Sequence, residues 1–126
     1  MIVGIGIDLI EIERIRGVYA RHGERFARRI LTSSEYVYVM RFSEPSQRLA
    51  GRWAAKEAAL KALGTGLSEG IGWRDVEIIP DERGKPKLVF YGRALERAAH
   101  LRASFHHVTI THSDTLAMAQ VILESI

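Results

Sequence analysis

The chain has 126 residues, of which 47% are hydrophobic and 26% charged, and its formal net charge is +3 at pH 7. This length predicts a single domain over residues 1–126, and the composition is typical of an ordinary globular protein. No apolar run approaches the ~20 residues that span a bilayer, and the first residues lack the basic flank of a signal peptide. Because cysteine is absent, a disulfide framework and a thiolate metal site are excluded, and we expect a cytoplasmic protein with no membrane partner.

The first predicted element is a strand over residues 3–9, in which apolar residues alternate with Gly4, Gly6 and Asp8. Glycine weakens a strand, so two glycines on one face indicate close approach by a ligand or by a tightly packed helix. From Glu11 the apolar spacing becomes helical, and this helix is expected to end at Gly23.

Two more helices are predicted downstream, after a short turn around residues 26–30. Residues 32–35 (Thr-Ser-Ser-Glu) have the order of a capping box, which opens a helix. The longest helix is predicted over residues 47–63, where alanine is frequent. Pro45 is expected in the first turn of this helix, and Gly64 is expected to end it.

The rest of the chain predicts two hairpins and a short helix. Their expected ranges, after a glycine-rich stretch over 64–72, are a hairpin of 76–79 with 87–91, a helix over 93–101, and a hairpin of 107–112 with 115–123. The order β, several α, ββ, α, ββ predicts an α+β domain with a largely antiparallel sheet.

Glu57 and Lys61 lie four residues apart and therefore on one face of the long helix. They are either a surface ion pair, worth only ~0.2–0.5 kcal/mol, or ligands of a metal or phosphate. Trp53 and Leu60 share their face, and an unpartnered charge is costly in apolar surroundings, which favours the second interpretation. Asp8 is either an N-cap or a second carboxylate for the same site. Two carboxylates from separate elements suit Mg²⁺ with substrate phosphates, and Lys61 would then donate to phosphate oxygens.

Three weaker signals accompany this pair. The Gly64-Thr-Gly66 turn either lets the backbone approach a phosphate chain or is a plain helix end. His112 ends a predicted strand, where a structural role competes with a binding role, and it forms no zinc set with its neighbours. Six arginines between residues 14 and 29 indicate either an acidic partner or a solvated helix surface. The glycines fit neither the dinucleotide-binding fingerprint nor a P-loop.

Taken together, these segments resemble the holo-[acyl-carrier-protein] synthases, the short type of 4′-phosphopantetheinyl transferase. The specific motifs are G-I-G-I-D at residues 4–8 and W-A-A-K-E-A-A-L-K at residues 53–61. Further matching blocks follow in order at 26–32, 75–78, 84–86 and 109–113. One small departure from the family pattern is Thr109-Ile-Thr-His112, where Ser-Ile-Ser-His is commoner. Threonine keeps the hydroxyl group of serine, so we expect little consequence.

The resemblance implies a 4′-phosphopantetheinyl transferase fold, in which a mainly antiparallel sheet packs on a long central helix. It implies Mg²⁺-dependent transfer of the phosphopantetheine arm of coenzyme A to a serine of apo acyl carrier protein, a step in fatty acid biosynthesis. Asp8 and Glu57 would hold the metal, and Lys61 would assist departure of adenosine 3′,5′-bisphosphate. Coenzyme A would contact Arg52, Gly64, Thr65, Gly66, Lys85, Pro86 and His112.

The resemblance also implies a homotrimer with active sites at subunit interfaces. The acidic carrier protein would meet a face made of Arg14, Ile15, Arg21, Arg25 and Phe26. A competing interpretation is a non-catalytic basic module that binds a carrier protein or nucleic acid. Nucleic acid is disfavoured, because the two carboxylates would then have no role and no base-stacking platform is evident.

Overall fold

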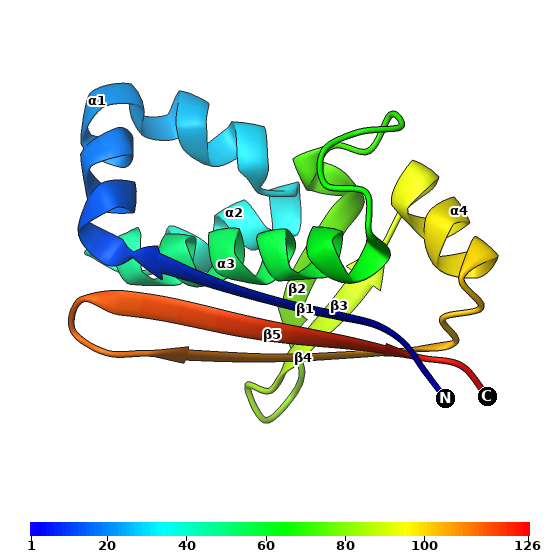
Figure 1. Ribbon diagram of the computed structural model, residues 1–126. Coiled ribbons are helices and arrows are strands. Elements are labelled where there is room, and N and C mark those ends of the chain that lie inside the picture. Colours follow the sequence, from blue (N-terminus) through cyan, green and yellow to red (C-terminus); the bar gives the residue numbers. More distant parts are fainter.

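The computed structural model describes all residues 1–126, and its centre is one long helix (Figure 1). The elements follow the predicted order: β1 (Ile2–Glu11), α1 (Ile12–Ile30), α2 (Ser33–Val39), α3 (Ser46–Leu63), a 3-10 turn η1 (Trp73–Asp75), β2 (Val76–Pro80), β3 (Pro86–Phe90), α4 (Gly92–His100), β4 (Phe105–His112) and β5 (Leu116–Glu124). The α+β class is confirmed. No helix is long and apolar enough to cross a bilayer.

The strands form two separate antiparallel sheets instead of one. The larger sheet has the order β1-β5-β4, and the β2–β3 hairpin forms the smaller one. In the larger sheet Asp8 pairs with Ala119 and Ile7 with Gln120. This sheet covers one side of α3, while α1 and α2 lie on the other side (Figure 1). The core therefore lies on both sides of α3, whose alanines and leucines are almost all buried.

Gly4 and Gly6 let β1 lie directly on the backbone of α3. A methyl group added at Gly6 would stand 1.8 Å from the carbonyl oxygen of Ala58, and one at Gly4 would stand 2.3 Å from that of Ala62. At Gly4 and Gly6 this face is therefore occupied by a packed helix and not by a ligand. The opposite face of β1 is open, with Ile5, Ile7 and Leu9 between 51% and 59% exposed.

Two predicted boundaries differ from the structure. Gly23 leaves the helical conformation (φ 54°, ψ −135°), but the chain resumes a helix after this kink, so residues 24–30 are helical where a turn was predicted. Burial of Ala27 and Ile30 against the core favours that second helical segment. Pro45 is the N-cap of α3 instead of a first-turn residue. The capping box of Thr32 with Glu35 and the left-handed Gly64 at the end of α3 are confirmed.

Candidate active site

Asp8 and Lys61 form an ion pair between the edge strand β1 and the helix α3. The Nζ of Lys61 donates to Oδ1 of Asp8 at 3.2 Å and to the carbonyl oxygen of Ile7 at 2.9 Å. Lys61 makes no ion pair with Glu57, so the surface-pair interpretation is wrong. Asp8 does not cap α1 either, since Glu11 holds the N-cap position. The packing of β1 on α3 thus brings Asp8 to the helix face that carries Lys61.

Glu57 lies on the same side of α3, in partly buried surroundings. Burial raises the pKa of the Glu57 carboxyl, the negative charge of Asp8 raises it further, and Lys61 opposes both effects. The two carboxylates therefore share one electrostatic environment. A pocket of about 450 Å³ opens beside them, lined by Asp8, Glu57, Arg14, Trp53 and neighbouring residues of β1 and β5.

Trp53 forms part of the wall of this pocket and belongs to an aromatic cluster. The ring centroid of Trp53 lies 4.6 Å from that of Trp73 and 6.1 Å from that of Phe26. Phe26 comes from α1 and Trp73 from η1, so two distant segments meet the catalytic helix here. The role of Trp73 was missed, because its sequence neighbourhood carries no periodic signal that would assign it a partner.

The arginines of α1 divide into paired and unpaired groups. Arg16 forms ion pairs with Glu13 and Glu44, and Arg28 with Glu24. By contrast, the exposed arginines Arg14, Arg21, Arg25 and Arg29 have no ion pair. Unpaired cations in a row leave this surface available to a negatively charged partner.

Ile15 and Phe26 were both expected on the same surface, but only Phe26 lies there. Phe26 is partly exposed and rests on Trp53. Ile15 is only 2% exposed and belongs to the core, so it does not lie on the surface where it was expected. Its position in the apolar stripe of α1 explains this, because that stripe is the face that packs inward.

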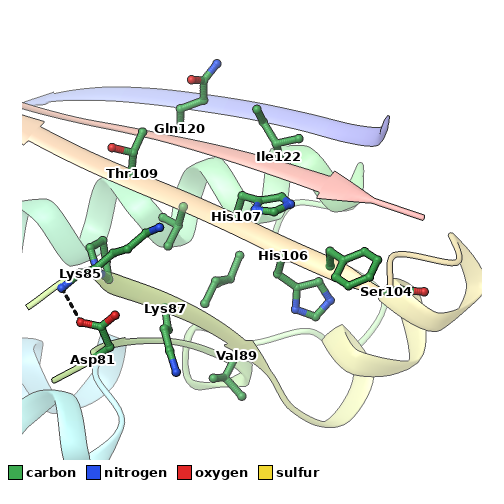
Figure 2. A pocket seen from close by; sticks show the side chains of 14 residues that line it. Asp81, Lys85, Lys87, Val89, Ser104, His106, His107, Thr109, Gln120 and Ile122 are labelled. Carbon is green, nitrogen blue, oxygen red and sulfur yellow. Dashed lines mark hydrogen bonds between the residues drawn. The ribbon is translucent and has the colours of Figure 1, made fainter. Parts of the chain in front are cut away.

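Lys85 and Pro86 lie away from the carboxylates. They line a second pocket of about 690 Å³ between the β2–β3 hairpin and β4, which shares no residue with the pocket at Asp8 (Figure 2). Asp81 fixes their turn by accepting hydrogen bonds from the backbone N–H groups of Lys85 at 2.9 Å and Arg83 at 2.8 Å. These two bonds lower the pKa of the Asp81 carboxyl.

The other residues expected to bind coenzyme A flank the site at the two ends of α3. Gly64 and Gly66, both with positive φ, follow Lys61 within one to two helical turns. At the opposite end, His112 lies 3.0 Å from Gln47 through its Nδ1. Arg52 is 7% exposed, its guanidinium lies 4.6 Å from the centre of the Tyr38 ring, and its Nε has no hydrogen-bond partner. One chain therefore brings Asp8, Glu57 and Lys61 together but not the full expected set.

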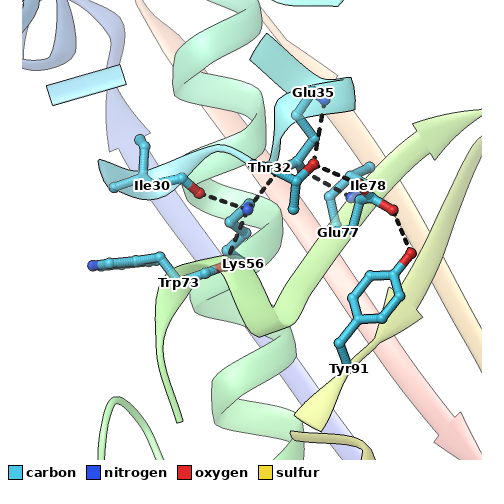
Figure 3. A network of polar contacts seen from close by, with 8 residues as sticks. All are labelled: Ile30, Thr32, Glu35, Lys56, Trp73, Glu77, Ile78 and Tyr91. Atoms are coloured by element: carbon cyan, nitrogen blue, oxygen red, sulfur yellow. Dashed lines mark hydrogen bonds and ion pairs between the residues drawn. The ribbon is translucent and has the colours of Figure 1, made fainter. Parts of the chain in front are cut away.

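A buried polar network beneath the site was not predicted (Figure 3). The Nζ of Lys56 lies 2.6 Å from Oε1 of Glu35, and both side chains are fully buried. Burial lowers the pKa of Lys56, and Glu35 opposes this shift. Glu35 was recognised only as a capping residue, and no sequence pattern links residues so far apart. Lys56 itself lies inside the motif at 53–61 but received no role.

Comparisons with known proteins agree with this arrangement. The 4′-phosphopantetheinyl transferase superfamily matches residues 4–119. The holo-[acyl-carrier-protein] synthase of Nitratidesulfovibrio vulgaris strain DP4 is 54% identical over 125 residues, which cover 99% of this chain and 100% of that protein.

Two crystal structures share the fold over essentially the whole chain. The holo-[acyl-carrier-protein] synthase of Neisseria meningitidis superposes with a TM-score of 0.89 at 36% identity, covering 99% of this chain and 100% of that one. The holo-(acyl-carrier-protein) synthase of Bacillus anthracis in complex with CoA (3′,5′-ADP) gives a TM-score of 0.83 at 40% identity, covering 100% and 99%. With the motifs, the carboxylate pair and these matches in agreement, the chain belongs to the 4′-phosphopantetheinyl transferase superfamily, among its holo-[acyl-carrier-protein] synthases.

Proposed function

We propose that this chain transfers the 4′-phosphopantetheine group of coenzyme A to a serine of apo acyl carrier protein and releases adenosine 3′,5′-bisphosphate. The observation that carries the proposal is that Asp8 and Glu57 line one pocket, with Lys61 paired to Asp8, in a chain of this family. Two carboxylates with one mobile ammonium suit a pyrophosphate substrate, because the carboxylates can hold a cation and the ammonium can contact a phosphate oxygen.

The residues at the pocket fit Mg²⁺. Asp8 and Glu57 come from different elements, and their mutual repulsion contributes to the raised pKa of Glu57, an unfavourable term that a divalent cation would offset. No group of three or more metal-ligating side chains exists, which suits an ion that takes one or two carboxylates and completes its shell with water and phosphate oxygens. When bound, Mg²⁺ supplies charge neutralisation and Lewis-acid polarisation at the pyrophosphate.

Lys61 would act on the leaving group. Its side chain is half-exposed and its contacts with Asp8 and Ile7 are at the surface, so the ammonium can move to a phosphate oxygen. The carrier serine hydroxyl gives its proton to a pocket carboxylate or to water, its oxygen forms a bond with the β-phosphorus, and the bond from that phosphorus to the bridging oxygen breaks. Lys61 stabilises the negative charge that develops on the departing bisphosphate. Catalysis here consists mainly of positioning and charge stabilisation.

We infer that the acidic carrier protein docks on α1. Arg14 reaches the pocket that holds the carboxylates, and the exposed Arg21 and Arg25 lie on the two sides of the kink at Gly23. Phe26 offers a partly exposed apolar contact beside Trp53. This arrangement would present the carrier serine to the phosphorus atom while arginines neutralise the acidic side chains around it.

We also propose a homotrimer in which coenzyme A lies between two copies. Lys85 and Pro86 are separated from Asp8 by the width of the sheet, so a neighbouring copy would have to supply one of the two groups. The outer face of the sheet supports such an assembly, because Ile5, Ile7, Leu9 and Met118 are exposed there side by side. The absence of cysteine and the use of coenzyme A suit a cytoplasmic location.

The direct test is a mass measurement on apo acyl carrier protein incubated with this chain, coenzyme A and Mg²⁺. Transfer adds one phosphopantetheine group to the carrier serine and produces adenosine 3′,5′-bisphosphate in equal amount. A serine-to-alanine carrier is the control and should gain no mass. A carrier that binds the chain but keeps its mass would refute the proposal and favour a passive binding module.

A further inference from the structure

Lys56 has all three of its N–H donors engaged inside the protein. Its Nζ donates to the carbonyl oxygen of Ile30 at 2.6 Å, to Oε1 of Glu35 at 2.6 Å and to the carbonyl oxygen of Trp73 at 3.1 Å (Figure 3). An ammonium group has three donors and no acceptor, so its hydrogen-bonding capacity is filled. Lys56 is 0% exposed, and no substrate can reach it.

The three acceptors belong to three different segments. Ile30 is the last residue of α1, Glu35 lies in the first turn of α2, and Trp73 opens η1. Glu35 extends the connection, because it also accepts from the backbone N–H of Thr32 at 2.8 Å and of Ile78 at 2.8 Å. One side chain of α3 thus anchors the end of α1, the start of α2 and the start of η1.

Two of these segments shape the surface where the carrier protein is proposed to dock. The helical turn that ends at Ile30 carries Arg25 and Phe26, and Trp73 stacks on Trp53 in the pocket wall. Lys56 is the immediate neighbour of Glu57, about 100° away on the same helix, so it points into the core while Glu57 points to the pocket. The ammonium therefore sets how far the arginine-bearing segment stands from the carboxylates.

Stability alone does not account for a buried pair of this kind. Removing two charges from water costs several kcal/mol per ion in general, and well-packed apolar replacements are often as stable or more so. What an apolar pair cannot supply is a fixed geometry for three separate backbone segments. Directional hydrogen bonds to two carbonyl oxygens and a carboxylate do supply it.

We propose that Lys56, held by Glu35, is a positioning residue for capture of the carrier protein: it fixes the docking segment of residues 24–30 and the aromatic wall relative to Glu57. This inference rests on the proposed transferase function. It assigns Lys56 no contact with either substrate. Loss of the Lys56 hydrogen bonds should therefore weaken binding of the carrier protein but leave coenzyme A binding and the chemical step unchanged.

The test is steady-state kinetics of Lys56→Met combined with Glu35→Gln, so that neither member of the pair is left charged without the other. The KM for carrier protein should rise by about tenfold or more, whereas kcat and the KM for coenzyme A should stay within about twofold of wild type. The matched control is Val121→Ala, a core truncation in β5 on the sheet side of α3. It should lower the Tm without changing the KM for carrier protein relative to the KM for coenzyme A.

Several outcomes overturn the inference. The inference is wrong if the KM for carrier protein is unchanged in the double variant. It is also wrong if the KM values for carrier protein and coenzyme A rise in parallel. If the double variant does not fold, Glu35→Gln alone is measured, because it keeps a hydrogen-bonding side chain. It should raise the KM for carrier protein by about threefold and leave the KM for coenzyme A unchanged. An unchanged KM for carrier protein in this variant also overturns the inference. A wild-type chain that transfers nothing refutes the proposed function itself, whereas an active wild type with unsplit variants refutes only the role of Lys56.

Discussion

The Nζ of Lys61 lies 3.2 Å from Oδ1 of Asp8 and bonds across elements instead of to Glu57 on its own helix. This contact joins the edge strand of the sheet to the central helix at the mouth of the pocket. It leaves Glu57 without an ion pair, and burial together with the negative charge of Asp8 raises the pKa of the Glu57 carboxyl. The site is therefore electrostatically incomplete in a way that a metal ion would correct.

Replacing Glu57 with glutamine should stabilise the metal-free protein at neutral pH. Burial and the charge of Asp8 raise the folded-state pKa of Glu57 above its ordinary value of 4.5. The stability gained from this carboxyl is present below that value and is lost as pH rises through the higher folded pKa. The Tm of Glu57→Gln minus that of wild type, measured by calorimetry, should be small at about pH 4 and positive at about pH 8.

Added Mg²⁺ should reverse this order. The ion should raise the Tm of wild type but not that of Glu57→Gln, and the variant should lose transfer activity. Glu96→Gln, at an exposed position of α4, is the control and should respond to Mg²⁺ as wild type does. Full activity in a folded Glu57→Gln protein would contradict the metal assignment.

Gly6 and Gly17 offer a matched pair of glycine-to-alanine changes. At Gly6 the new methyl group would stand 1.8 Å from a backbone oxygen of α3, so β1 must shift, and we expect a loss of about 1–3 kcal/mol or more. At Gly17 its nearest neighbour would be 3.5 Å away, and alanine in this helix should stabilise by about 0.5–1 kcal/mol. Urea unfolding measures both. A neutral Gly6→Ala would contradict the backbone-to-backbone packing.

Arg14→Ala should weaken the carrier protein selectively. Arg14 lines the catalytic pocket and has no ion pair, so its loss should raise the KM for carrier protein by about threefold to tenfold and reduce the salt dependence of that KM. Arg16→Ala is the control, because Arg16 is already paired with Glu13 and Glu44. Equal losses for carrier protein and coenzyme A would argue against separate surfaces.

A lysine at Ile7 should prevent self-association. Ile7 is 51% exposed in the middle of the apolar sheet face, where a charge would have to be buried on assembly. Val37, 59% exposed on α2, is a comparable apolar position outside that face. Sedimentation velocity should therefore show smaller particles for Ile7→Lys and an unchanged distribution for Val37→Lys. An Ile7→Lys protein that keeps its mass in solution would exclude this interface.

Local signals in the sequence predicted much of the fold. Alternation marked β1, the capping box marked the start of α2, and Gly64 marked the end of α3. These signals involve only a few neighbouring residues, so they can be recognised without knowledge of the tertiary structure. The helical segment after Gly23 was missed because its stability comes from burying Ala27 and Ile30, a tertiary effect.

The site was predictable where specific motifs contain its residues and unpredictable where residues outside those motifs pack against it. Asp8, Glu57 and Lys61 were placed together from two motifs, and in the structure Asp8 and Glu57 line one pocket while Lys61 pairs with Asp8. The burial of Ile15 and the pairing of Lys56 with Glu35 depend on which faces pack together, which spacing alone does not fix. The division of the strands into two sheets likewise depends on long-range pairing.

The separation of the pocket of Asp8, the partner of Lys61, from the pocket of Lys85 has a genetic consequence. If each active site contains Lys61 from one copy and Lys85 from another, two inactive variants can complement each other in a mixed oligomer. Lys61→Met and Lys85→Ala chains, each silent alone, would form mixed oligomers in which some sites contain both wild-type lysines. Activity recovered on mixing would show that the site is shared, and a chain defective at Lys61 would be rescued by a chain defective in the turn between β2 and β3.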